Sequence, residues 1–109
     1  MKSLKYDIRF TIIRQTDDQN LYYMPDKYCN SITVKNIDGT NTDTCTVNNN
    51  VTLQPGDNAN KIPGESFSFG GNYAELYAGT ARIQLTFSGA AGIALVIEKY
   101  YTNYEEICQ

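Results

Sequence analysis

The feature that most constrains this fold is the regular succession of short alternating segments and turn residues. In the segment 5–14, Tyr6, Ile8, Phe10 and Ile12 alternate with polar residues. This period of two, together with β-branched and aromatic side chains, indicates a strand whose apolar residues form a buried face. No long stretch of the chain has helical periodicity, so the sequence predicts an all-β protein.

Further strands are expected between the turn residues that divide the chain. In the segment 80–87, Ile83, Leu85 and Phe87 share one face of a strand, which is expected to be buried. The segment 93–101 is more continuously apolar, which favours a central strand covered on both sides. The remaining expected strands are 28–37, two short strands or one bulged strand within 45–53, 66–69 and 73–77, with 21–24 as an edge strand or packed loop.

Three dipeptides predict specific turns. Asp38-Gly39 favours the positive φ angles of a tight hairpin turn. Pro55-Gly56 and Pro63-Gly64 predict type II turns, because Pro presets the first central residue and Gly supplies the positive φ of the second. Turns of this kind between short strands are typical of a β-sandwich or jelly roll.

The length of 109 residues corresponds to one domain. We therefore expect a single β-sandwich or jelly-roll-like domain of about eight short, mostly antiparallel strands. It spans 1–109, with a core at about 4–102 and a tail at 103–109. The tail has the length of one helical turn, but we interpret it as irregular.

Charge and hydropathy argue against two classes of partner. The chain has 9 Lys and Arg, scattered along its length, against 12 Asp and Glu. A nucleic-acid-binding protein needs a basic face, so we expect no nucleic-acid partner. The longest apolar run, Ile93 to Ile97, is far shorter than the about 20 residues that span a bilayer, and charged residues interrupt the N-terminal segment. We expect synthesis in a reducing cytoplasm and no membrane partner.

The residues of common catalytic sites are missing from the sequence. The chain has no histidine, which removes the usual Ser-His and Cys-His nucleophile systems. Glu75 and Glu98 lie among apolar residues, and either is a candidate for a buried acid. Its cationic partner would be Arg82 or Lys99. A buried ion pair between an acid and a base is more often structural than catalytic. We expect no enzyme activity and no cofactor.

The three cysteines do not form a recognisable framework. An odd number argues against a secreted disulfide scaffold, so free thiols are expected, with a Cys29–Cys45 bridge as the alternative. Asp38, Asn41 and Asp43 offer oxygen ligands for calcium within one loop, but their spacing fits no EF-hand. Because Asp and Asn also form turns, the sequence favours no metal site.

Tyrosine is the most unusual component, with nine residues and no tryptophan. Adjacent tyrosines on a strand point to opposite faces, and a small domain cannot bury all nine. Tyrosine is common at protein interfaces, and its ring also stacks on sugars. The candidate interface or ligand residues are Tyr22, Tyr23, Tyr73, Tyr77, Tyr100 and Tyr101.

The C-terminal half resembles a known class of protein. The residues that carry the resemblance are Pro63-Gly64-Glu65-Ser66, Gly70-Gly71-Asn72, the run Ala74 to Gly79, an Ile-x-Leu-x-Phe strand and Ile97 to Tyr101. Over about 53–102 the chain is similar to small β-sandwich proteins of tailed bacteriophages, notably crAss-like phages, that decorate the capsid or build head fibres. The resemblance implies a multimeric virion protein that contacts copies of itself and other virion proteins. The alternative is a carbohydrate-binding module that uses exposed tyrosines to bind glycans.

Overall fold

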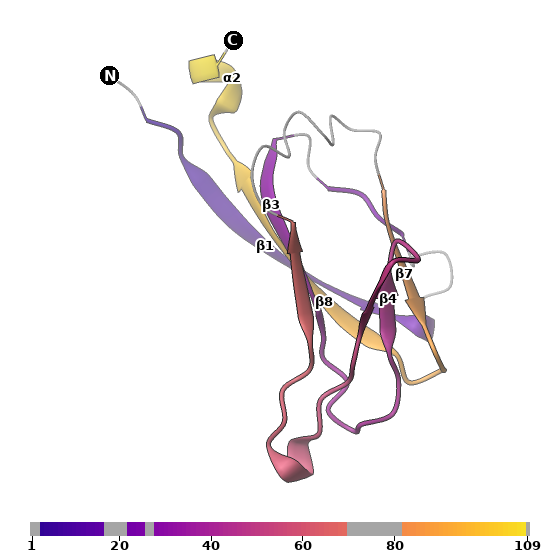
Figure 1. Ribbon diagram of the computed structural model, residues 1–109. Coiled ribbons are helices and arrows are strands. Elements are labelled where there is room, and N and C mark those ends of the chain that lie inside the picture. The colour runs from indigo at the N-terminus through magenta and orange to yellow at the C-terminus, as the bar shows by residue number, and fades with distance from the viewer. Residues whose placement is uncertain (1–2, 17–21, 26–27, 70–81, 109) are drawn as a thin grey trace.

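The protein is a β-sandwich of two antiparallel sheets, as the sequence predicts. The computed structural model describes residues 3–16, 22–25, 28–69 and 82–108. The first sheet has the order β1 (Tyr6–Arg14), β8 (Ile93–Tyr101), β3 (Cys29–Asn36) and β6 (Ser66–Phe69). The second has the order β2 (Tyr22–Tyr23), β7 (Ile83–Phe87), β4 (Cys45–Val47) and β5 (Val51–Leu53) (Figure 1). The described helices are η2 (Asn58–Asn60) and α2 (Tyr104–Cys108).

The pairing of these strands is that of a jelly roll. The first strand pairs with the eighth, the second with the seventh, the third with the sixth and the fourth with the fifth. Such nested pairs arise when one long antiparallel hairpin is rolled up on itself. The pairs β3–β8 and β4–β7 then join the rolled hairpin into two sheets. Two Greek keys folded in this way define the jelly-roll architecture.

The core lies between the two sheets and is filled from alternate strand positions. The predicted buried face of β7 is confirmed, because Ile83, Leu85 and Phe87 are all buried. They face the inward residues of the other sheet, which include Ile32, Val34, Ala94 and Val96. Cys29 and Cys45 are buried free thiols, as expected, and do not form the alternative bridge.

Several predicted strand positions are confirmed and one is corrected. β6 and β8 have the predicted bounds, and Tyr22–Tyr23 forms an edge strand. β8 is central, between β1 and β3, but the prediction that both its faces are covered is wrong. Its outward residues, among them Ile93, Leu95 and Ile97, are half-buried, and its described partner strands β1 and β3 lie beside it in the same sheet. The predicted strand 73–77 and the turn 70–72 lie outside the described residues.

The end of the chain is helical rather than irregular. Tyr104–Cys108 forms α2, and the ring of Tyr104 stacks on Tyr28 with the centroids 5.0 Å apart. The Tyr28 hydroxyl donates to Glu105 Oε1 in the first turn of this helix. A segment this short is marginal as an isolated helix, and its contacts with Tyr28, just before β3, explain why it forms here.

None of the three dipeptides forms the turn predicted for it. Asp38-Gly39 does not close a hairpin, because β3 and β4 belong to different sheets and the segment crosses between them. Neither Gly56 nor Gly64 has a φ in the left-handed region that the second central residue of a type II turn requires, so neither Pro-Gly pair forms that turn. Both glycines are instead needed for close approach of backbones. A Cβ atom on Gly56 would lie 2.8 Å from the Gly64 nitrogen, and one on Gly64 would overlap the Asn36 carbonyl oxygen.

A run of asparagines forms the hairpin turn between β4 and β5. Asn48 and Asn49 have φ angles of 52° and 56°, in the left-handed region that Asn tolerates better than most residues. Two successive positive φ angles match the twist of a hairpin. The chain therefore has two short strands here, the first of the two predicted arrangements.

The molecule is longer than a compact domain of its size. Its principal extents are 50 × 28 × 21 Å and its radius of gyration is 15.2 Å. A compact domain of this length has a radius of about 13 Å. Figure 1 shows two contributions: the first part of β1 and the last part of β8 extend past the second sheet toward both termini, and the loop that carries η2 extends at the opposite end.

Candidate interaction surface

An exposed apolar strip runs along the outer face of β1. It consists of Tyr6, Ile8, Phe10 and Ile12, which we call the outer strip. Their exposed fractions are 56%, 47%, 66% and 51%. The prediction that these residues form a buried face is therefore wrong. Period-two alternation shows that a strand has two chemically different faces, but it does not say which one the second sheet covers.

The outer strip continues onto the neighbouring strand. Phe10 lies opposite Ile97 and Ile12 opposite Leu95, so that half-buried side chains of β8 extend the apolar surface sideways. The four residues of the outer strip alone expose roughly 400 Å², taking about 200 Å² for a large side chain of which half is exposed. The largest apolar patch on a monomeric protein is typically about 300–600 Å² and is often functional, so the outer strip is a candidate interaction surface.

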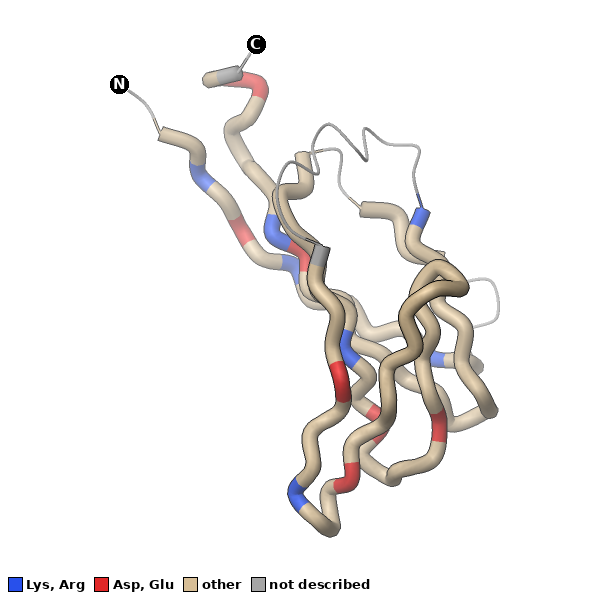
Figure 2. Tube along the Cα trace, in the orientation of Figure 1, with Lys and Arg blue, Asp and Glu red and all other residues tan. Residues whose placement is uncertain are grey.

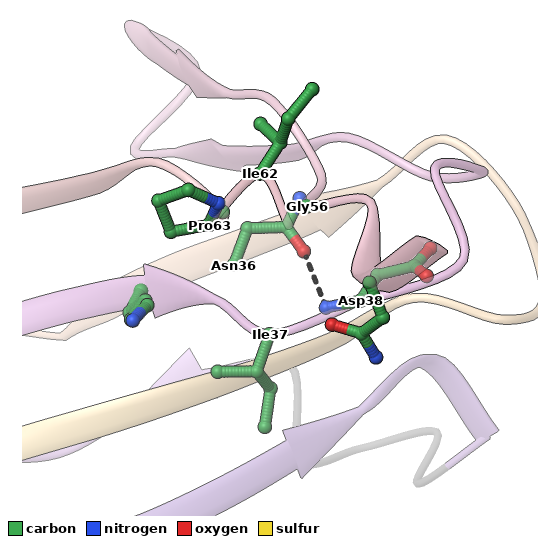
Figure 3. Close-up of a pocket in the computed structure, with 10 residues that line it drawn as sticks. Asn36, Ile37, Asp38, Gly56, Ile62 and Pro63 are labelled. Carbon is green, nitrogen blue, oxygen red and sulfur yellow. Dashed lines mark hydrogen bonds between the residues drawn. The ribbon is translucent and has the colours of Figure 1, made fainter. Parts of the chain in front are cut away.

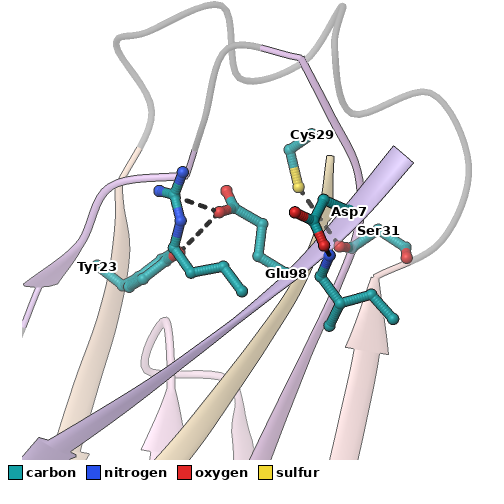
Figure 4. A network of polar contacts seen from close by, with 7 residues as sticks. Asp7, Tyr23, Cys29, Ser31 and Glu98 are labelled. Carbon is teal, nitrogen blue, oxygen red and sulfur yellow. Dashed lines mark hydrogen bonds and ion pairs between the residues drawn. The ribbon is translucent and has the colours of Figure 1, made fainter. Parts of the chain in front are cut away.

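The inner face of β1 contributes Ile13 to the core and also carries Arg9, which pairs with a buried acid. Glu98, on β8, is fully buried; its Oε1 accepts a hydrogen bond from the Tyr23 hydroxyl at 3.0 Å and lies 3.4 Å from Arg9 Nη1. Figure 4 shows these groups meeting between the strands. Among the described residues Glu98 forms an ion pair with Arg9, whereas the sequence suggested Arg82 or Lys99 as the partner. Glu75 lies outside the described residues.

This network explains why β1 presents its apolar side to solvent. Arg9 lies opposite Glu98 in the β1–β8 ladder, on the inner face. A shift of one residue would turn Arg9 outward and remove the cation from a buried carboxylate. Burial, followed by the proximity of Glu98, raises the pKa of Tyr23 well above its ordinary value, so the phenol stays protonated as a donor. The register of β1 is therefore fixed by contacts of Arg9 with β8 in its own sheet and, through Glu98, with Tyr23 of the second sheet.

The predicted tyrosines do not form a single surface. Tyr22 is 45% exposed on β2, whereas its neighbour Tyr23 is buried in the network described above. Tyr100 and Tyr101 are half-buried near the end of β8, where the Arg9 guanidinium lies 4.8 Å from the centroid of the Tyr100 ring. Tyr73 and Tyr77 lie outside the described residues. The exposed strip that sequence reasoning missed contains a different tyrosine, Tyr6.

Part of the tyrosine surplus holds the C-terminal helix in place. The rings of Tyr101 and Tyr104 lie 6.1 Å apart, and Tyr104 also stacks on Tyr28. The Tyr101 hydroxyl donates to Asn30 Oδ1 at 3.1 Å. These aromatic contacts connect α2 to the projecting end of the first sheet, a structural use of tyrosine.

A cavity of about 310 Å³ lies where the chain crosses from β3 to β4, lined by residues that include Asn36, Asp38 and Pro63 (Figure 3). The Asp38 carboxylate accepts hydrogen bonds from the backbone N–H groups of Thr40 and Asp43, each at 2.8 Å. Although burial favours the neutral acid, hydrogen bonds from Thr40 and the backbone hold the pKa of Asp38 below its ordinary value. These oxygens therefore order the loop.

The loop residues that the sequence offers as oxygen ligands have other structural roles. Asn41 has a φ of 56° and occupies a turn position. Asp43 Oδ1 accepts from the Ser88 hydroxyl at 3.3 Å. Within the ranges that the structure describes, no group of three or more His, Cys, Asp or Glu side chains is arranged to hold a metal ion. Asn41 and Asp43 shape the loop through a turn and a hydrogen bond.

Charges of both signs are interspersed along the described chain, including the projecting end of β1 and β8 (Figure 2). There Lys99 Nζ lies 4.0 Å from the centroid of the Tyr6 ring, so a cation also covers part of the outer strip. None of the described helices has the length and apolar character needed to span a membrane.

Comparison with protein-family models, with curated proteins and with solved structures gives no match to this chain.

Proposed function

We propose that the protein is a non-catalytic structural subunit that acts by protein–protein assembly, as a capsid decoration or head-fibre subunit in the virion of a tailed bacteriophage. The observation that carries this proposal is the outer strip. Keeping roughly 400 Å² of apolar side chain in water forgoes about 10 kcal/mol of burial free energy, at about 25 cal/mol per Å². A surface of this kind is useful to a protein that covers it with a partner.

The fold and the sequence resemblance support the same class. Jelly rolls occur in viral capsid proteins, lectins and cupins, so the architecture is compatible with assembly without specifying it. The resemblance to phage decoration and head-fibre proteins covers about 53–102. The chain has no histidine to supply the usual acid–base groups. We propose the host cytoplasm as the site of synthesis and the virion as the final location, with copies of the chain and other virion proteins as partners.

The proposal is tested by locating the chain in infected cells. Particles produced by the genome that encodes it are purified on a density gradient, and peptides of the chain are quantified against those of the main shell protein. We expect many copies in each particle and depletion from the soluble fraction. Recovery in the soluble fraction alone, with none in purified particles, would refute a virion role.

A carbohydrate-binding function is the second candidate, since lectins also use the jelly roll and Tyr22 is exposed. However, the Arg82 guanidinium lies 4.8 Å from the centroid of the Tyr22 ring and covers one face. A glycan array tests this alternative: it predicts a signal that Tyr22→Ala abolishes, and an array without signal excludes the glycans it displays.

A further inference from the structure

We propose that the free edge of β1 pairs antiparallel with β1 of a second copy, about a two-fold axis at Ile8, so that two four-stranded sheets become one continuous sheet of eight strands. This inference rests on the proposed assembly function and names the first partner as the chain itself. It follows from the edge position of β1, from the direction of its backbone groups and from the charges that the pairing brings together.

β1 has the properties of an unprotected edge strand. It is the outermost strand of its sheet and pairs with β8 over nine residues without a bulge, and no other described strand pairs with it. It contains no proline. Natural edge strands are usually short, bulged, interrupted by proline or charged along the edge, because a long regular edge is a template for another strand. Of these protections β1 has only charges, and they are of both signs: Asp7, Arg9 and Arg14. A regular nine-residue edge with an apolar outer face is therefore suited to strand addition.

The hydrogen bonds of the ladder show which residues face the free edge. The Thr102 N–H donates to the Lys5 carbonyl at 2.9 Å, and the Gln15 N–H donates to the Gly92 carbonyl at 2.9 Å. In an antiparallel ladder such bonded pairs alternate with non-bonded pairs. The odd-numbered residues of β1 thus bond to β8, and the residues of the outer strip direct their N–H and C=O groups away from it.

One of these outward groups already has a substitute partner. The Ile8 N–H donates to Oδ1 of Asp7 at 2.8 Å, and the Asp7 side chain is exposed. A carbonyl of a second β1 strand could accept from the same N–H. The Asp7 carboxylate would then be free for another partner, which the pairing itself provides.

The charges select the register. With the two-fold axis at Ile8, Asp7 of each copy lies directly opposite Arg9 of the other, and the symmetry makes this pair twice. The apolar side chains match as well, because Tyr6 lies opposite Phe10. Opposite charges and aromatic pairs facing each other across two strands are both favourable. An axis at Arg9 would instead place two arginines opposite one another, and an axis at Phe10 would place Asp7 opposite Ile13.

The register predicts a specific crosslink. In a Cys108→Ser background, Ile8→Cys places two thiols opposite each other across the axis, where bonded antiparallel residues have Cα atoms about 5.5 Å apart, within disulfide range. We expect mild oxidation to convert most of this variant to a covalent dimer. Phe10→Cys is the matched control, because its symmetry mate lies four residues away along the ladder. Equal crosslinking of the two variants, or none in either, would overturn the proposed register.

The charge pairs give a second test that leaves the strand intact. Analytical ultracentrifugation of the wild-type chain should show a reversible dimer, and Asp7→Lys should weaken it about tenfold or more, since two attractions become repulsions. Glu106→Lys makes the same charge change at an exposed position on α2. A wild-type chain that stays monomeric up to the millimolar range, or an equal effect of both substitutions, contradicts the inference.

The outcomes separate this inference from the proposed function. A chain that is monomeric in solution but abundant in purified particles would disprove β1 self-pairing and leave the virion role standing. A chain that forms the Ile8-centred dimer but is absent from particles would support the pairing and disprove the virion role.

Discussion

Removing the Tyr23 hydroxyl should destabilise the protein far more than removing the adjacent Tyr22 hydroxyl. The Tyr23 hydroxyl donates to Glu98 Oε1 at 3.0 Å, where Glu98 is 0% exposed and Tyr23 is 7% exposed. A hydrogen bond to a charged group contributes about 1.5–3 kcal/mol, and water cannot readily replace the donor at this depth. We therefore expect Tyr23→Phe to lower the free energy of unfolding by about 2 kcal/mol.

Urea denaturation followed by far-ultraviolet circular dichroism measures this change, and thermal unfolding should show a loss of about 10 °C. Tyr22→Phe is the matched control, since its residue is the next one along the same strand and is 45% exposed. Its effect should stay within about 0.5 kcal/mol. Equal losses of unfolding free energy from the two substitutions would show that the hydrogen bond of Tyr23 to Glu98 does not stabilise the fold.

A double-mutant cycle tests the same reasoning from the other side. Glu98→Gln keeps an acceptor oxygen but replaces a charged acceptor with a neutral one, for which a hydrogen bond contributes about 1 kcal/mol. In this background Tyr23→Phe should cost about half of what it costs in the wild type. Strict additivity of the two substitutions would show that the groups do not interact.

Two further predictions concern the core and the loop crossing. Burial raises the pKa of the Cys45 thiol from 9.0 to about 11. The folded state therefore holds this proton more tightly than the unfolded state, and this contribution to stability is present below pH 9 and is lost as the pH rises to 11. Between about pH 8 and about pH 11 the wild type should therefore lose roughly 2–3 kcal/mol more unfolding free energy than Cys45→Ala does. Gly64→Ala should destabilise by about 2–3 kcal/mol, because its Cβ meets the Asn36 backbone, whereas Gly39→Ala meets the movable Asn58 side chain and should cost less. Chemical denaturation checks both, and equal losses at the two glycines would contradict the close-approach argument.

Much of the strand framework follows from local patterns. The buried face of β7 is set by Ile83, Leu85 and Phe87, and the bounds of β6 and β8 match the predicted ones, because period-two alternation between turn residues is a local property of the chain. The same local reasoning predicts type II turns at Gly56 and Gly64 and is wrong there. Their conformation depends on backbone segments that approach from elsewhere, including the Asn36 carbonyl.

The sequence by itself determined that the outer strip forms one apolar face of β1, that Asp7, Arg9 and Thr11 lie on the other face, and that the protein is an all-β sandwich. Only the tertiary structure decided which of the two faces meets solvent. That choice depends on Glu98, which is distant in sequence, lies opposite Arg9 in the ladder and needs the Tyr23 hydroxyl from the second sheet. A buried carboxylate requires its partners wherever the chain supplies them, and this requirement places the apolar side of β1 in solvent.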